Sequence, residues 1–141
     1  MISNYANASA LLFYSLSDLN WAGFYFLKDN KLILGPFQGR TACTEIEVGK
    51  GVCGTAVKED CTQLVPDVHQ FPGHIACDSR SNSEIVVPVR AGGRIVAVLD
   101  IDSPLTGRFS EDDKKGLENF VSVLEEKLET VFLSEEGYTE S

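Results

Sequence analysis

The chain has 141 residues, of which 43% are hydrophobic and 23% charged, and its formal net charge is −9. This length suits a single domain with one core. The acidic balance argues against nucleic acid or an anionic membrane surface as a partner, because binding phosphate groups requires a basic field. The first residues lack the pattern of a secretory signal, and no apolar run is long enough to span a bilayer. We therefore expect a cytoplasmic protein whose thiols are kept reduced.

Apolar periodicity in the first half of the chain predicts a series of short elements. In chain order they are a helix, a hairpin, a strand, a glycine-rich segment leading into a short helix, and another strand, at residues 8–19, 22–34, 46–48, 49–58 and 63–65. Asp29 and Asn30 are predicted to form the hairpin turn. A long polar loop follows at 67–81. In a compact domain, a loop of this length more often has a function than not.

The second half begins with a predicted hairpin and ends in a long helix. Two apolar strands, 84–89 and 94–101, are joined around Gly92-Gly93, which is a strong hairpin signal. Ser110 and Asp113 resemble a capping box at a helix start. The apolar stripe of that helix consists of Leu117, Phe120, Val121, Leu124, Leu128 and Val131.

This order of elements predicts an α+β fold in which helices flank a central antiparallel sheet. We expect one domain over residues 1–133, followed by a mobile acidic tail at 134–141.

Three acidic residues are predicted to converge on one face of the sheet. Asp100 and Asp102 alternate with apolar residues at the end of a strand, so both project from the same face. Antiparallel pairing around the glycine turn brings Glu84, at the start of the neighbouring strand, close to them. Like charges at such a distance raise one another's pKa, which can leave one carboxyl group protonated near neutral pH. The alternative interpretation is a solvated strand end, which is the commoner case for any single acid.

An aromatic pair is predicted on another strand. Trp21, Gly23 and Tyr25 share one strand face, which places two rings around a glycine and leaves a slot between them. The alternative is that both rings only pack in the core.

The cysteine pattern favours reactive or buried thiols over a zinc site, because no C-x-x-C pair is present. Cys77 lies in the long polar loop, where a thiol is accessible, and precedes Glu84 by seven residues. Cys53 stands at a predicted helix start, which favours the thiolate. Cys43 lies in another loop, and Cys61 follows two acids that disfavour its thiolate, so we assign Cys61 no role.

Five segments of the chain resemble the free methionine-(R)-sulfoxide reductase family, whose members are GAF-type domains. The segments are NWAGFY (20–25), GPFQG (35–39), GKGVCG (49–54), HIACD (74–78) and LDIDSP (99–104). The likeness covers about residues 8–130. Cys43, Cys53 and Cys77 also match the family's cysteines, with separations of ten and twenty-four residues. The family's longer N-terminal helical segment is the main departure.

The resemblance implies a role for each matching residue. Cys77 corresponds to the catalytic nucleophile, Cys43 to the thiol that closes the resolving disulfide, and Cys53 to a third cysteine with an auxiliary role. Whether Cys43 or Cys53 is the main resolving thiol for Cys77 stays open from the sequence. The remaining site positions are the carboxylates Glu84, Asp100 and Asp102, the rings Trp21 and Tyr25 around the S-methyl group, and the substrate-binding loop residues Ile75 and Ala76.

The resemblance thus implies reduction of free L-methionine-(R)-sulfoxide without a metal or an organic cofactor. A carboxyl group with a raised pKa, Glu84 foremost, would protonate the sulfoxide oxygen. The Cys77 thiolate would become a sulfenic acid and then a disulfide with Cys43, which a thioredoxin-type dithiol would reduce. A homodimer is compatible with this assignment.

Two other functions remain open from the sequence. One is a non-catalytic GAF module that binds a small ligand, because fold alone does not fix function. The other is a redox sensor whose Cys43–Cys77 disulfide is itself the signal.

Overall fold

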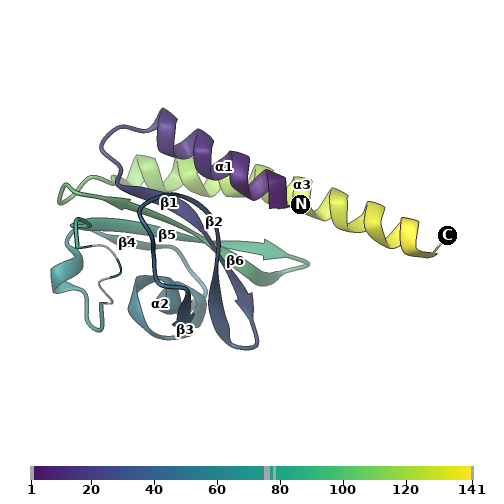
Figure 1. The fold of residues 1–141 in the computed structure, drawn as a ribbon, viewed down its shortest axis with the longest axis horizontal. Helices are drawn as coiled ribbons and strands as arrows, with labels where there is room; N and C mark the ends of the chain where they lie inside the picture. Colours follow the sequence, from purple (N-terminus) through teal and green to yellow (C-terminus); the bar gives the residue numbers. More distant parts are fainter. Residues whose placement is uncertain (1, 75–76, 78, 141) are drawn as a thin grey trace.

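The computed structural model describes residues 2–74, 77 and 79–140, with side chains up to Leu128. Its centre is a six-stranded antiparallel sheet in the order β3-β2-β1-β6-β5-β4. The strands are β1 (Trp21–Lys28), β2 (Lys31–Gly39), β3 (Glu45–Glu47), β4 (Gln63–Val65), β5 (Ser83–Ala91) and β6 (Arg94–Ser103). Helices α1 (Ile2–Ser15) and α3 (Glu111–Glu140) cover one face, and α2 (Gly51–Glu59) lies on the other (Figure 1). The predicted α+β architecture is therefore confirmed.

The helix α1 begins and ends earlier than the predicted range of 8–19. Asp18 explains the early end, because its left-handed backbone (φ 59°) does not continue a right-handed helix. The helix packs on β1 and β2 through an apolar stripe of Tyr5, Ala8 and Leu12. Among the described residues, no helix combines the length and apolar character needed to cross a membrane.

Both predicted hairpin turns are present. Asp29 and Asn30 have positive φ angles of 51° and 65°, and Gly92 and Gly93 have 59° and 77°. Two central residues with positive φ define the turn whose twist matches that of the flanking strands. The second turn sets the register of β5 against β6, and this register fixes the position of the acidic residues described below.

The sheet separates two apolar clusters. The first lies between the sheet and helices α1 and α3, and its strand residues are Ala22, Phe24, Ile85, Val87, Val89, Ala97, Leu99 and Ile101. The second lies between the sheet and α2, and its members include Trp21, Tyr25, Ile46, Val52, Cys53, Ala56, Val86 and Val98. Alternate residues of β1, β5 and β6 contribute to the two sides, as the strand period of two requires.

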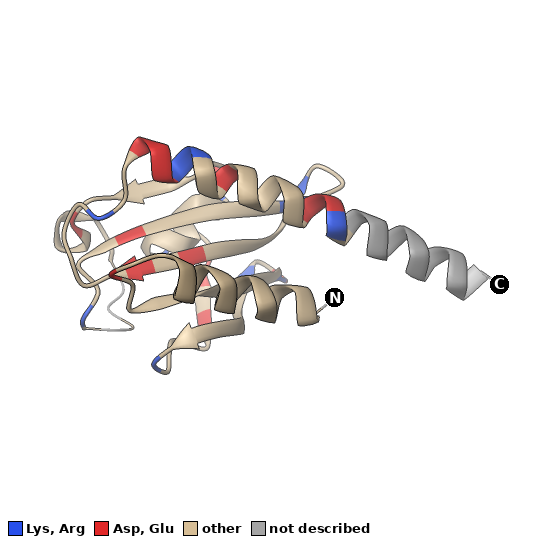
Figure 2. Cartoon of the chain, turned by 90° about the horizontal axis from the view of Figure 1, so that it is seen from above, with Lys and Arg blue, Asp and Glu red and all other residues tan. Residues whose placement is uncertain are grey.

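Helix α3 starts with the predicted cap. The Ser110 amide donates to Asp113 Oδ2 at 2.8 Å, and the Asp113 amide donates to Ser110 Oγ at 3.1 Å. Asp thus replaces the usual Glu in a reciprocal capping box. Acidic residues fill the first turn (Figure 2), where they complement the helix dipole. The helix continues to Glu140, into the segment predicted as an acidic tail. The domain boundary at 133 and the mobility of the tail stay predictions.

Candidate active site

The three predicted acidic residues meet on the α2 side of the sheet. In the β5–β6 register, Glu84 is paired with Asp102 and Val86 with Asp100. In the β1–β6 register, Asp102 faces Trp21 and Asp100 faces Gly23. All three acids are buried, with exposed fractions of 6–8%. The solvated strand end considered from the sequence is therefore excluded, and the predicted convergence is confirmed.

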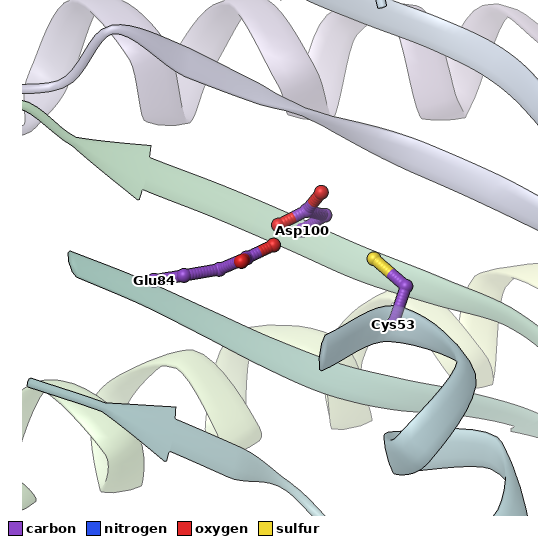
Figure 3. A group of neighbouring side chains, drawn as sticks. All are labelled: Cys53, Glu84 and Asp100. Carbon is purple, nitrogen blue, oxygen red and sulfur yellow. The ribbon is translucent and has the colours of Figure 1, made fainter. Parts of the chain in front are cut away.

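Cys53 faces these acids from the first turn of α2. Figure 3 shows its thiol directed toward the carboxyl groups of Glu84 and Asp100, which rise from β5 and β6. One sulfur and two carboxylate oxygens of these residues lie within 4.8 Å of one another, so they could together hold a metal ion such as zinc. Gly54, the next residue, lets α2 pack closely on the segment that leads into it, because a Cβ there would lie 2.5 Å from the Glu47 carbonyl oxygen.

Cys43 and Cys77 form a disulfide with a Cα–Cα distance of 5.4 Å. This distance lies in the normal range for disulfides. The bond joins two loops that are 34 residues apart in the sequence. Cys53 and Cys61 are free, the former buried and the latter exposed. Of the thiols that the sequence proposed as redox partners of Cys77, the structure pairs it with Cys43.

The disulfide lies at the margin of a small cavity whose volume is about 40 Å³. Cys77, Cys53, the three acids and the two predicted rings all line this cavity. Six further lining residues were not assigned a function from the sequence, namely Ala42, Ile46, Gly51, Val52, His74 and Ser81. The signal that could have indicated His74 and Ser81 is their place in the long loop next to Cys77.

The rings of Trp21 and Tyr25 stack with centroids 5.9 Å apart, as their shared strand face predicts. Phe37 of β2 extends the stack, with its ring centroid 5.2 Å from that of Trp21. The prediction of an open slot at Gly23 is wrong. Phe37 occupies this space, because a Cβ added at Gly23 would collide with it. The glycine instead allows β2 to approach β1 at a β-bulge.

Hydrogen bonds attach both rings to the loop that carries Cys43. The Trp21 indole donates to the Arg40 carbonyl at 3.1 Å, and the Tyr25 hydroxyl donates to the Cys43 carbonyl at 2.9 Å. The predicted pair of aromatic residues therefore does more than fill the core, since it positions the backbone of a disulfide cysteine.

The long loop before β5 is anchored near both of its ends. A short 3₁₀ turn, η1 (Val68–Gln70), holds the first part, and the Val68 amide donates to the Asn82 carbonyl at 2.9 Å. At the other end, the Asn20 side chain donates to Ser81 Oγ at 3.0 Å. The predicted substrate-binding residues Ile75 and Ala76 lie outside the described residues.

Burial and mutual repulsion control protonation at the site. Burial, together with Asp100 and Asp102, raises the pKa of Glu84 well above its ordinary value of 4.5. Burial also raises the pKa of Asp100, but hydrogen bonds from Glu84 and Cys53 oppose this rise. Both carboxyl groups therefore favour the protonated form, and the contact between them favours protonation of Glu84 over that of Asp100. The sequence prediction of a protonated carboxyl group is thereby supported.

The Cys53 thiol is not activated by its helix position. Burial, followed by the charges of Asp100 and Glu84, raises the pKa of Cys53 well above its ordinary value of 9.0. The expectation that the start of α2 favours a Cys53 thiolate is therefore wrong, because burial beside acids outweighs the helix dipole. Burial likewise raises the pKa of Tyr25 and lowers that of His74.

Comparison with known proteins agrees with this geometry. The GAF domain family model matches residues 9–128. The free methionine-R-sulfoxide reductase of Escherichia coli (strain K12) is 55% identical over 129 residues, which cover 92% of this chain and 78% of that protein.

Two solved structures share the fold at high identity. Reduced fRMsr of Staphylococcus aureus has a TM-score of 0.89 and 58% identity, covering 91% of this chain and 83% of that one. Free methionine-R-sulfoxide reductase from Neisseria meningitidis, in complex with its substrate, has a TM-score of 0.91 and 41% identity, covering 94% and 80%.

The antiparallel sheet, its three helices and the family match define a GAF domain protein with a site of thiols and acids. Within the GAF domain proteins, the chain belongs to the free methionine-R-sulfoxide reductases. The resemblance and the GAF-type fold expected from the sequence are both confirmed.

Proposed function

We propose that this protein reduces free L-methionine-(R)-sulfoxide to L-methionine, with Cys77 as nucleophile and Cys43 as resolving thiol. The observation that carries the proposal is the Cys43–Cys77 disulfide beside a cavity lined by Glu84, Asp100 and Asp102. A disulfide alone would suit many redox proteins. A disulfide next to a buried proton donor suits the removal of an oxygen atom from sulfur.

Glu84 is the proton donor in this proposal. A sulfoxide oxygen leaves sulfur only when it is protonated or strongly hydrogen-bonded. Burial and the neighbouring acids raise the pKa of Glu84 well above its ordinary value, which favours the protonated form that can donate. The Cys77 thiolate attacks the sulfoxide sulfur, the S–O bond breaks, and the oxygen ends on Cys77 as a sulfenic acid. Methionine is the reduced product.

Cys43 completes the cycle. Its thiol attacks the Cys77 sulfenic acid, forming the S–S bond and releasing water. The Tyr25 hydroxyl holds the Cys43 backbone, which keeps this thiol close to its target. A thioredoxin-type dithiol then reduces the disulfide by thiol–disulfide exchange, which restores both thiols. No step of this scheme passes through a metal or a bound organic group.

The acidic residues also account for a preference for the free amino acid. Asp100 Oδ1 is buried and has no hydrogen-bond partner among the described residues, so it can accept from the substrate ammonium. A methionine sulfoxide within a polypeptide lacks this ammonium. The ammonium also offsets acidic charge that would otherwise raise the pKa of the attacking thiol. Trp21 and Tyr25 would contact the S-methyl group.

Turnover of the two epimers of free methionine sulfoxide, with dithiothreitol as reductant, tests the proposal. We expect the R epimer to be reduced and the S epimer not. Cys77→Ser should abolish turnover, a loss of at least about a thousandfold for an enzyme without its nucleophile. Cys61→Ser is the matched control, since that thiol is exposed and outside the site, and it should retain full activity.

Two results would favour the other functions. Folded protein that reduces neither epimer but binds free methionine would indicate a ligand-binding GAF module. Protein that forms the Cys43–Cys77 disulfide with peroxide, without turnover, would indicate a redox sensor. Activity that survives in Cys77→Ser would move the nucleophile to another thiol.

A further inference from the structure

We infer that Cys53, Glu84 and Asp100 form an inhibitory site for one thiophilic divalent cation such as Zn²⁺, at the place where the proposed substrate puts its ammonium group. The binding of the ion rests on the arrangement of these three side chains alone. Its inhibitory effect rests on the proposed function, because the ion and the substrate would share Asp100.

The three ligands come from three elements that meet at one corner of the cavity. Cys53 lies in the first turn of α2, and Figure 3 shows its thiol directed toward the carboxyl groups of Glu84 on β5 and Asp100 on β6. One donor atom of each residue lies within 4.8 Å of the other two. A tetrahedral zinc ion needs ligand separations of about 3.5 Å, so small side-chain rotations of about 1 Å close the site.

The mixture of donor atoms selects the kind of ion. Oxygen ligands alone suit Mg²⁺ or Ca²⁺, whereas a thiolate among them favours Zn²⁺ and other thiophilic ions. All three residues line the cavity of about 40 Å³, which has room for an ion with one or two waters. Water therefore completes the coordination shell, and the cavity provides the path of entry for an ion to residues that are otherwise buried.

The charge of the cavity indicates a positive ligand independently of the ligand distances. Three acids line the cavity, and none of its described lining residues is Lys or Arg. Asp100 is only 6% exposed, and its Oδ1 atom has no hydrogen-bond partner among the described residues. A buried carboxylate oxygen without a partner is costly unless it gains a donor or a cation. This oxygen can accept from an ammonium group or bind a metal ion, but not both at once.

The ion and the substrate therefore exclude each other. A metal ion binds the thiolate and carboxylate forms, so its arrival releases the protons held by Cys53 and Glu84 to the solvent. The sulfoxide then lacks its proton donor, and the substrate ammonium meets a positive charge at Asp100. Inhibition should be competitive with free methionine-(R)-sulfoxide and should be reversed by a chelator.

Titration of the oxidised chain with Cd²⁺ tests the site without turnover. In this form Cys43 and Cys77 are joined, so Cys53 and Cys61 are the thiols left to bind the ion. Cadmium bound to a thiolate gives an ultraviolet charge-transfer band, which should reach its full height at one ion per chain. Zn²⁺ should remove the band by competition and Mg²⁺ should not. Absence of the band, or its removal by Mg²⁺, would overturn the inference.

Matched variants locate the bound ion. Cys53→Ser should remove the band, whereas Cys61→Ser should retain it, because Cys61 is exposed and lies outside the cavity. The reverse pattern would overturn the inference. Asp100→Asn, checked for folding by circular dichroism, should weaken Cd²⁺ binding at least about tenfold, since even outer-shell partners of a metal contribute that much. Unchanged affinity in this variant would remove Asp100 from the site.

Competition with the substrate tests the inhibitory role. In a chain that carries both Cys43→Ser and Cys77→Ser, the substrate can bind but cannot react, and Cys53 and Cys61 are again the thiols left. Free methionine-(R)-sulfoxide should displace Cd²⁺ from this chain. In the reduced wild type, Zn²⁺ should stop methionine formation until a chelator is added. Full turnover in the presence of bound Zn²⁺ would overturn the inhibitory role.

The two proposals fail in different ways. A wild-type chain that binds Cd²⁺ through Cys53 but never reduces the sulfoxide would overturn the proposed function and leave the ion site in place. A chain that reduces the R epimer but gives no Cys53-dependent band would overturn the ion site and leave the proposed function in place.

Discussion

The two faces of the sheet use the same strands for different purposes. On the helical face, β6 contributes Ala97, Leu99 and Ile101 to a cluster beneath α1 and α3, and each is completely buried. On the α2 face, the same strand contributes Val98 and then two buried acids, Asp100 and Asp102. One strand therefore supplies both core and chemistry by alternation.

The two faces differ in the kind of ionisable group that they bury, and therefore in what burial costs the folded state. The helical face buries a titratable phenol, Tyr5, but burial raises its pKa to about 12, so the group is neutral at physiological pH. The α2 face buries three carboxyl groups beside a thiol. Burying such groups is unfavourable unless they share protons or gain a cation. We therefore expect substitutions on the α2 face to affect activity, and those on the helical face to affect stability.

Glu84→Gln should have the largest effect and should change activity and stability in opposite directions. Loss of the proton donor is expected to lower kcat/KM by about 100-fold or more. The raised pKa means that folded Glu84 keeps a proton that the unfolded chain releases above pH 4.5. Stability of the wild type therefore falls as pH rises above that value, and glutamine removes this loss.

The check for Glu84→Gln is thermal unfolding at pH 5 and pH 8, alongside steady-state kinetics. The gain in Tm over the wild type should be larger at pH 8, by a few degrees, since about 1 kcal/mol shifts Tm by roughly 3–5 °C at this size. A variant that is equally active, or less stable at pH 8, would contradict the assignment of the buried proton.

Leu99→Ala should have the next largest effect, on stability alone. The side chain is fully buried on the helical face, so its truncation should cost about 2–5 kcal/mol in the free energy of unfolding. Activity of the folded fraction at low temperature should stay close to that of the wild type. Leu105→Ala is the matched control, because Leu105 is 48% exposed. Urea unfolding measures the free energy of unfolding of both variants. Equal losses in the two variants would contradict the role of the helical face as the stabilising core.

Ser110→Ala should have the smallest effect. It removes one half of the capping box at α3 and should cost about 1 kcal/mol of stability without changing kcat/KM. Ser122→Ala is the control, because it removes a serine from the interior of the same helix, where its hydroxyl donates to the Glu118 carbonyl. If the two variants unfold at the same urea concentration, the cap contributes nothing.

Sequence reasoning predicted the acidic site because its geometry follows from local rules. Strand alternation places Asp100 and Asp102 on one face, and the Gly92-Gly93 turn sets the register that brings Glu84 opposite Asp102. Cysteine spacing, read through the family resemblance, likewise indicated the Cys43–Cys77 pair. The hairpins and the cap of α3 were predictable for the same reason, since each depends on neighbouring residues.

Features that depend on tertiary packing could not be predicted in this way. Phe37 reaches Trp21 through a bulge between β1 and β2, which no periodicity indicates. The environment of Cys53 depends on the docking of α2 against the sheet, so a helix-start argument gave the wrong direction for its pKa. The early end of α1 depends on one left-handed residue, Asp18.

The most direct test of the central claim is a single turnover without reductant. Fully reduced protein is mixed with excess free methionine-(R)-sulfoxide, the methionine formed is counted, and the quenched chain is alkylated and mapped. The account predicts one methionine per chain, a Cys43–Cys77 disulfide, and Cys53 still free. Methionine formed without that disulfide, or a disulfide that includes Cys53, would contradict it.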